Sequence, residues 1–195
     1  MADEGKIEKA RAALLFGIRT LRDGDRFNVI NFSGEEHLMS ADLVKADEAG
    51  RSKGIEFVNK LTPSGGTNIN DSLAAAMKQF DNSGRPQMLV FMTDGLPTVG
   101  ETDAAKILAN IRSIRQKGVR IFPFGFGYDV NTSLLDGLGT ENGGISGYVQ
   151  PKEDIEIKVS NFFAKVSSPV LSSLSLDLGT LNAADVFPKK LPDLF

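Results

Sequence analysis

Two oxygen-bearing side chains, Asp94 and Thr67, stand where this sequence could bind a cation. Asp94 follows the apolar run 87–92 in the stretch MTDGLPTVGE, and Thr67 lies in the glycine-rich stretch SGGTNIND, ahead of a helical pattern. Ligand sites in open parallel sheets collect beyond the carboxyl ends of the strands, where Asp94 falls. A carboxylate and a hydroxyl, with no cysteine and only His37 as a histidine, favour a hard cation such as Mg²⁺ over zinc or copper. The spacing also fits structural roles, in which Asp94 stabilises a turn and Thr67 caps a helix.

The elements that would position these residues alternate between strands and helices. Apolar runs predict strands, and apolar residues at steps of three and four predict helices. Alternating strands and helices imply right-handed crossovers and an α/β fold, a doubly wound and mostly parallel sheet flanked by helices. The predicted strands are 26–32, 87–92, 119–127 and 147–150, and the predicted helices are 5–22, 43–61, 70–81, 102–117, 131–141 and 153–167.

Composition excludes several classes of function. The chain has 195 residues and a formal net charge of -3, with lysine and arginine scattered among the acids, so a nucleic-acid surface is disfavoured. No apolar run reaches the roughly 18 residues of a membrane span, and the first residues do not read as an export signal. We therefore expect no membrane insertion, and the sequence alone does not determine where the protein is located.

An ordered set of motifs adds a family resemblance. The segments KIEKARAAL, DRFNVINF, GGTNINDSL, VFMTDGLPTVGET, IFPFGFGYDVN and LDGLGTENGG resemble the von Willebrand factor type A domain, in the version found in inter-alpha-trypsin inhibitor heavy chains and their bacterial relatives. The resemblance assigns residues 1–168 to this domain. Residues 169–195 form a C-terminal extension, in which the alternating stretch LSLDL predicts the start of a following β segment. Relatives of this group are mostly secreted or cell-surface proteins.

The resemblance implies a divalent cation, Mg²⁺ or another, at a metal-ion-dependent adhesion site. Thr67 and Asp94 match two ligands of that site, and Asp129, after the next strand, would support it from outside the ligand set. The other ligands of the family come from an Asp-x-Ser-x-Ser motif, which does not occur in this sequence. We expect that motif, and the central strand that carries it, to lie upstream of Met1. We therefore expect metal binding to be weak or absent, with an open position in the middle of the sheet.

Three functions follow as hypotheses. The first is a non-enzymatic adhesion module whose partner, a protein or matrix ligand, offers an acidic group to the cation. The second is a structural or assembly fragment that exchanges strands with another chain, which includes a homodimer. The third is a Mg²⁺-dependent hydrolase or phosphoryl-transfer enzyme that uses Asp94. The sequence argues against an enzyme, because it offers neither a nucleophile and base pair nor a phosphate-binding loop.

Overall fold

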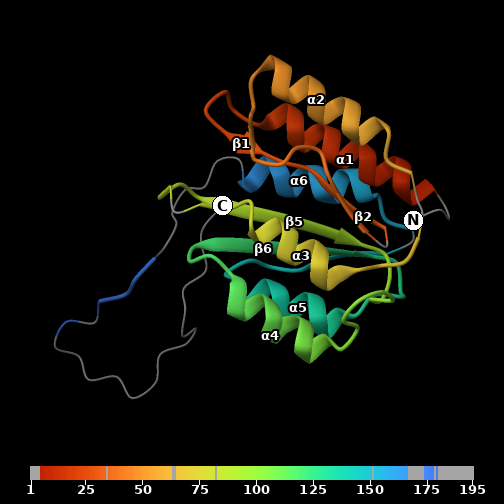
Figure 1. Ribbon diagram of the computed structural model, residues 1–195, viewed down its shortest axis with the longest axis vertical. Helices are drawn as coiled ribbons and strands as arrows, with labels where there is room; N and C mark the ends of the chain where they lie inside the picture. The colour runs from red at the N-terminus through yellow and green to blue at the C-terminus, as the bar shows by residue number, and fades with distance from the viewer. Residues whose placement is uncertain are drawn as a thin grey trace.

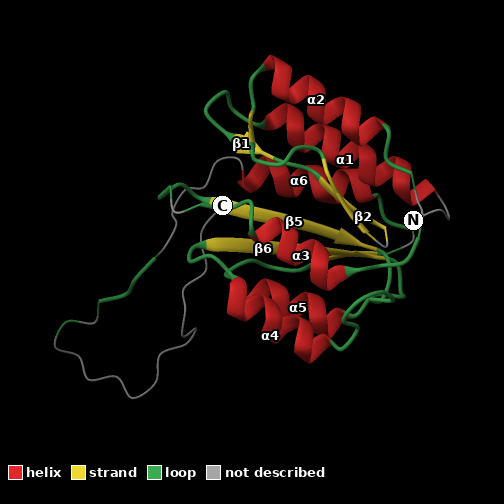
Figure 2. Cartoon of the chain, in the orientation of Figure 1, coloured by secondary structure: helices red, strands yellow, loops and turns green. Residues whose placement is uncertain are grey.

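The computed structural model describes residues 5–33, 35–62, 65–81, 83–150, 152–166, 174–177 and 179. Helices and strands alternate along most of these ranges, as Figures 1 and 2 show. The helices are α1 (Lys6–Thr20), α2 (Glu48–Asn59), α3 (Ile69–Met77), α4 (Ala104–Ile114), α5 (Thr132–Glu141) and α6 (Ile155–Val166). The strands are β1 (Arg26–Phe27), β2 (Ile30–Ser33), β3 (Glu35–Leu38), β4 (Val44–Lys45), β5 (Gln87–Thr93), β6 (Val119–Phe126) and β7 (Gly147–Val149).

The main sheet is parallel and has the order β5-β6-β7. Its β5–β6 ladder runs from the pair Gln87↔Val119 to the pair Thr93↔Gly125. Helix α4 connects β5 to β6, and α5 connects β6 to β7, as parallel neighbours require. The α/β prediction of a parallel sheet flanked by helices is therefore confirmed.

Two apolar layers cover the sheet. On one face, buried residues of α3, α4 and α5 pack against the β5 and β6 side chains that include Phe91 and Ile121. On the other face, α1 and α6 pack against Phe122, Phe124 and Phe126 of β6. Figure 1 shows this division, with α4 and α5 on one side of β5 and β6 and with α1, α2 and α6 on the other.

The region before β5 departs from the predicted elements. The expected strand 26–32 is split into β1 and β2, because Asn28 Oδ1 accepts hydrogen bonds from the amides of Val29 (2.9 Å) and Ser40 (3.2 Å). At this point of the chain, between the end of β1 and the start of β2, these side-chain bonds take the place of ladder bonds. Strands β3 and β4, which the sequence did not predict, pair antiparallel with β2 and β1.

Several helices are shorter than the sequence patterns suggested. The prediction of a helix over 43–61 is wrong at its start, because residues 44 and 45 pair with β1 and Asp47 then caps α2 by accepting from Gly50 N at 2.9 Å. No helix in the described ranges is long and apolar enough to cross a membrane. Residues 174–177 form no strand, and the remainder of the expected C-terminal β segment lies outside the described residues.

Strand β5 has a ladder on one side only. Within the described part of the chain β5 pairs with β6 alone, and β2 pairs with β3 alone. The two strands meet through side chains, since the rings of Phe32 and Phe91 stack with centroids 5.1 Å apart. Residues 87–90 of β5 are consequently half-buried, whereas β6 is buried at all but one position. The edge of β5 that has no ladder among the described residues accounts for this incomplete burial.

Candidate functional site

The loops that carry Thr67 and Asp94 are hydrogen-bonded to each other at the carboxyl end of β5. Thr67 O accepts from Thr98 N at 2.9 Å and from Val99 N at 3.3 Å. In the opposite direction, Thr67 N donates to Thr98 Oγ1 at 2.8 Å. Three hydrogen bonds therefore hold Thr67 against the segment that follows Asp94.

Glycines allow the two loops to approach closely. A Cβ atom added to Gly66 would lie 2.3 Å from Val99 Cγ2, a distance that no side chain tolerates without movement. A Cβ atom added to Gly95 would lie 3.7 Å from Thr67 Oγ1. The Thr67 hydroxyl therefore lies beside the residue that immediately follows Asp94, and Asp94 itself is half-buried.

The start of α3 fixes the other side of Thr67. Asn68, which is buried, caps α3 by accepting from Asp71 N at 3.2 Å, and its amide donates to Asp71 Oδ2 at 2.8 Å. Gly100 packs over this cap, and a Cβ atom there would lie 2.9 Å from Asn68 Oδ1. The backbone of Gly100 is also left-handed (φ 69°), a conformation that glycine adopts readily. Hydrogen bonds from Asn68 and Asn70 lower the pKa of Asp71. The cap of α3 is Asn68, so the alternative in which Thr67 caps this helix is wrong.

The other residues named from the sequence have separate positions. Asp129 lies three residues beyond β6, at the same edge of the sheet as the end of β5, and its side chain is exposed. Near Glu101, Asp103 caps α4 and accepts from Lys106 N at 2.9 Å. His37 is exposed on β3.

The donor set does not fit a tight divalent site. The described residues contain no group of three or more histidine, cysteine, aspartate or glutamate side chains that could hold a metal ion. Thr67 and Asp94 offer one neutral and one charged oxygen, while Mg²⁺ demands near-ideal octahedral geometry and gives up its waters reluctantly. Asp3 and Glu4, two further acids in the sequence, lie outside the described residues.

Sequence reasoning missed Thr98, which makes the strongest contact with Thr67. Its hydroxyl and its amide both bond to Thr67, 31 residues away in the chain. The only sign of this role in the sequence is that Thr98 is one of the two hydroxyl residues in the stretch TDGLPT. Nothing in the spacing of these residues indicates that Thr98 bonds to Thr67. The sequence also gave no sign of the close neighbours of Gly66 and Gly100, which are Val99 and Asn68.

Comparison with known proteins identifies the family. The family model for the von Willebrand factor type A domain matches residues 2–148. The chain therefore belongs to the von Willebrand factor type A domain family. Inter alpha-trypsin inhibitor heavy chain 4 of Mus musculus is 33% identical over 180 residues, which covers 88% of this chain and 19% of that protein. The chain thus spans about a fifth of the length of this curated relative.

Solved structures show the same fold. A von Willebrand factor type A protein from Catenulispora acidiphila superimposes with a TM-score of 0.75 at 23% identity, covering 86% of this chain and 40% of that chain. Proximal thread matrix protein 1 from the mussel byssus, in a form with a zinc-occupied MIDAS motif, gives a TM-score of 0.62 at 17% identity. That alignment covers 83% of this chain and 42% of the mussel chain.

Proposed function

We propose that this domain is a non-enzymatic protein-binding module with a reduced metal-ion-dependent adhesion site. The observation that carries the proposal is the packing of Thr67 against the loop of Asp94 at the carboxyl end of β5. Domains of this family are protein-interaction modules, and one structural neighbour holds zinc at its adhesion motif. Thr67 and Asp94 would contribute the hydroxyl and the carboxylate of the corresponding site here.

The cation is proposed to bind weakly. Two donors leave most of the coordination sphere to water, and a single carboxylate supplies only one negative charge. A dissociation constant of about 10 mM would make occupancy small at physiological Mg²⁺. The partner, a protein or matrix ligand, would add an acidic group to the cation, and Asp129 would support the site from the loop after β6.

Thermal unfolding during titration with MgCl₂ or MnCl₂ tests this proposal. A cation that binds only the native state stabilises it by RT ln(1 + [L]/Kd), about 0.8 kcal/mol at about 30 mM for that dissociation constant. For a chain of this length the expected rise in Tm is about 2–3 °C. The reference titration uses NaCl at matched ionic strength, because added salt screens surface charges as well.

Two variants separate a site effect from a general salt effect. Asp94→Asn should abolish the rise, while Asp42→Asn, at an exposed acid outside the site, should retain it. Equal responses of wild type and Asp94→Asn would refute metal binding at these residues. A rise of several degrees at about 1 mM would instead show a complete, tight site. Turnover of a generic phosphate ester that depends on Asp94 would overturn the non-enzymatic assignment.

A further inference from the structure

One asparagine of the chain, Asn142, is followed directly by a glycine, Gly143. In such a pair, the backbone nitrogen of the glycine can attack the side-chain carbonyl carbon of the asparagine. Glycine favours this attack because it has no side chain to obstruct the approach and its backbone turns freely. Every other asparagine of the sequence precedes a residue that carries a side chain. The sequence therefore contains a single pair with this intrinsic reactivity.

The reaction of this pair consumes only water. A bond forms between Gly143 N and Asn142 Cγ, and the bond from Cγ to Nδ2 breaks. The amide proton of Gly143 leaves with Nδ2 as ammonia, and a cyclic imide remains. Water then adds to one of the two imide carbonyls, and its proton returns to the nitrogen. Position 142 becomes an aspartate or an isoaspartate, according to the carbonyl that is attacked.

The end of α5 holds both reacting groups away from this path. Asn142 is the residue that ends α5, and it is only 8% exposed. Its Nδ2 donates to Leu138 O at 2.8 Å, which fixes the side chain along the last turn of the helix. The amide of Gly143 is directed at Thr140 O, 3.5 Å away, and so it does not face Asn142 Cγ. The folded structure therefore separates the nucleophile from the carbon that it would attack.

The backbone after Asn142 has little room to rearrange. Gly144 N donates to Gly139 O at 2.9 Å, and a Cβ atom on Gly144 would lie 1.9 Å from the backbone oxygen of Ile121. The glycine pair is thus packed directly against β6. Ring closure requires rotation about the bond between Cα and the carbonyl carbon of Asn142, which carries Gly143 and Gly144 with it. The reaction consequently requires this segment to open locally.

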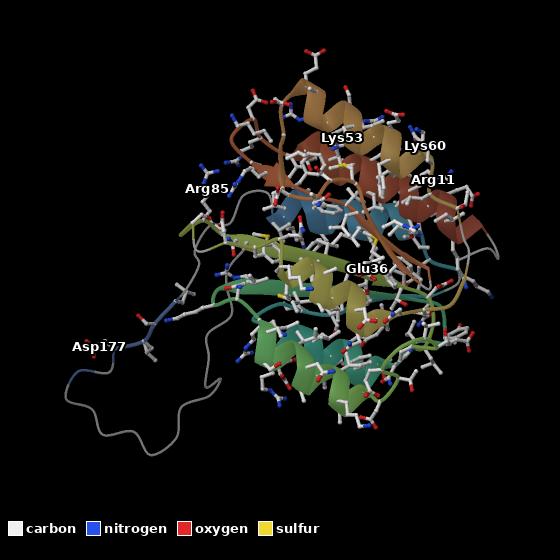
Figure 3. The ribbon with its side chains drawn as sticks, viewed as in Figure 1. Arg11, Glu36, Lys53, Lys60, Arg85 and Asp177 are labelled. Atoms are coloured by element: carbon white, nitrogen blue, oxygen red, sulfur yellow. The ribbon has the colours of Figure 1, made fainter. Side chains whose placement is uncertain are left out.

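Side chains of α4 hold the same end of α5 from outside. Arg112 donates to both carboxylate oxygens of Glu141, at 3.1 and 2.7 Å, and Arg115 Nη1 donates to Glu141 O at 2.7 Å. The two helices share an apolar layer, and Figure 3 shows their side chains along this contact. Glu141 directly precedes Asn142, so opening at Asn142 strains these bonds. The contacts from α4 therefore help to set how often the segment opens.

Conversion of Asn142 would weaken the end of α5. An aspartate or isoaspartate lacks the Nδ2 donor, so Leu138 O would lose its partner in a buried position. The new carboxylate would also lie at the C-terminal end of a helix, where the helix dipole disfavours negative charge, and next to Glu141. Both effects favour the open state. The change is one-way, because the ammonia is lost.

We propose that Asn142 and Gly143 form a self-modification site whose rate is set by local opening of the end of α5. The capped helix keeps the pair unreactive, and opening of the segment releases it. Because the reaction is intramolecular, burial of Asn142 controls it without any enzyme having to reach the site. This site is separate from Thr67 and Asp94, and its reaction requires no cation.

Incubation of the full chain, folded in buffer or unfolded in guanidinium chloride at the same pH and temperature, tests the proposal. Peptide mass spectrometry follows the mass gain at Asn142 as its amide becomes a carboxylate. Isomerisation of an aspartate leaves the mass unchanged, so it does not interfere. The folded chain should react at least about tenfold more slowly than the unfolded chain, because the rate follows the population of the open segment. Asn110, which precedes an isoleucine, is the internal control and should stay unmodified in both samples.

Two variants test the role of α4. Arg115→Gln removes the bond to Glu141 O and should speed modification of the folded chain about threefold. Lys117→Gln removes the same charge at an exposed position between α4 and β6 and should leave the rate unchanged. In guanidinium chloride both variants should react as fast as wild type, since the chemistry of the pair itself is unaltered. Asn142→Asp, which reproduces one product, should lower Tm by about 2–6 °C.

Four results would overturn the proposal. Equal rates in the folded and unfolded chains would show that opening does not control the reaction. Absence of a mass gain at Asn142 in the unfolded chain would show that the pair is unreactive. Equal acceleration by Arg115→Gln and Lys117→Gln would assign the effect to charge and not to the contact with α5. An unchanged Tm for Asn142→Asp would show that conversion leaves the end of α5 intact. None of these measurements involves a divalent cation, so the metal proposal is tested separately.

Discussion

Replacing Thr98 with valine should loosen the loop that carries Thr67. The substitution keeps the shape of the side chain and removes the hydroxyl that accepts from Thr67 N at 2.8 Å. A typical intramolecular hydrogen bond contributes about 0.5–1.5 kcal/mol to stability. Thr98 is exposed, so water can replace part of the lost bond, and the expected loss is about 0.5–1 kcal/mol.

For a chain of this length, that loss corresponds to a fall in Tm of about 1–4 °C. Urea unfolding provides the free energy, and hydrogen exchange at the Thr67 amide provides a local measurement that global stability does not dominate. Thr98→Ser retains the hydroxyl and should keep the Thr67 amide protected. If Thr98→Val matched wild type in both measurements, the hydrogen bond would not hold the site, and the reasoning about loop packing would be refuted.

Two further predictions concern other parts of the fold. Gly50→Ala places a Cβ atom 1.9 Å from the backbone oxygen of Lys45, so it should destabilise the domain by about 2–3 kcal/mol in urea unfolding. Gly24→Ala, where a Cβ atom meets nothing within 4 Å, should be neutral or slightly stabilising, and equal losses at both sites would contradict the packing argument. Burial, and then the hydrogen bond with Asp136, raise the pKa of Tyr148 to about 12, so one of the two tyrosines should titrate near pH 12 by tyrosinate absorbance. Folding favours the neutral phenol, so the stabilisation is present below about pH 10 and is lost as the pH rises towards 12. Tyr148→Phe should remove the upper titration step, and its persistence would assign that step elsewhere.

The sequence predicted the main elements because their patterns were long and unambiguous. The apolar runs at 87–92 and 119–127 became β5 and β6, and the pattern over 131–141 predicted α5. The sequence left Asn131 and Thr132 as alternative caps, and the structure shows Asn131, whose side chain accepts from Leu134 N at 3.0 Å. Boundaries were less accurate where two capping residues competed. Both Glu101 and Asp103 can start a helix, and only the backbone conformation of the loop decided for Asp103.

The candidate site was predictable only as a meeting of two loops. Topology places the ends of parallel strands at one edge, so Thr67 and Asp94 could be expected on the same rim. The contacts that hold them there are specific to distant pairs, such as Thr67 with Thr98 and Gly66 with Val99. Hydrogen bonds between residues about 30 positions apart leave no periodic pattern in a sequence, and therefore no sequence argument could identify them.

The largest difference between pattern and structure lies in β5, and it has a physical meaning. The run QMLVFM is the composition of a strand covered on both faces and paired on both edges. The structure instead leaves residues 87–90 half-buried beside an edge that has no ladder among the described residues. Water can satisfy the exposed backbone groups, but it cannot satisfy the apolar side chains, whose incomplete burial forfeits about 25 cal/mol for each Å² left exposed. The half-buried side chains of β5 are therefore the part of the strand whose burial the described residues leave incomplete.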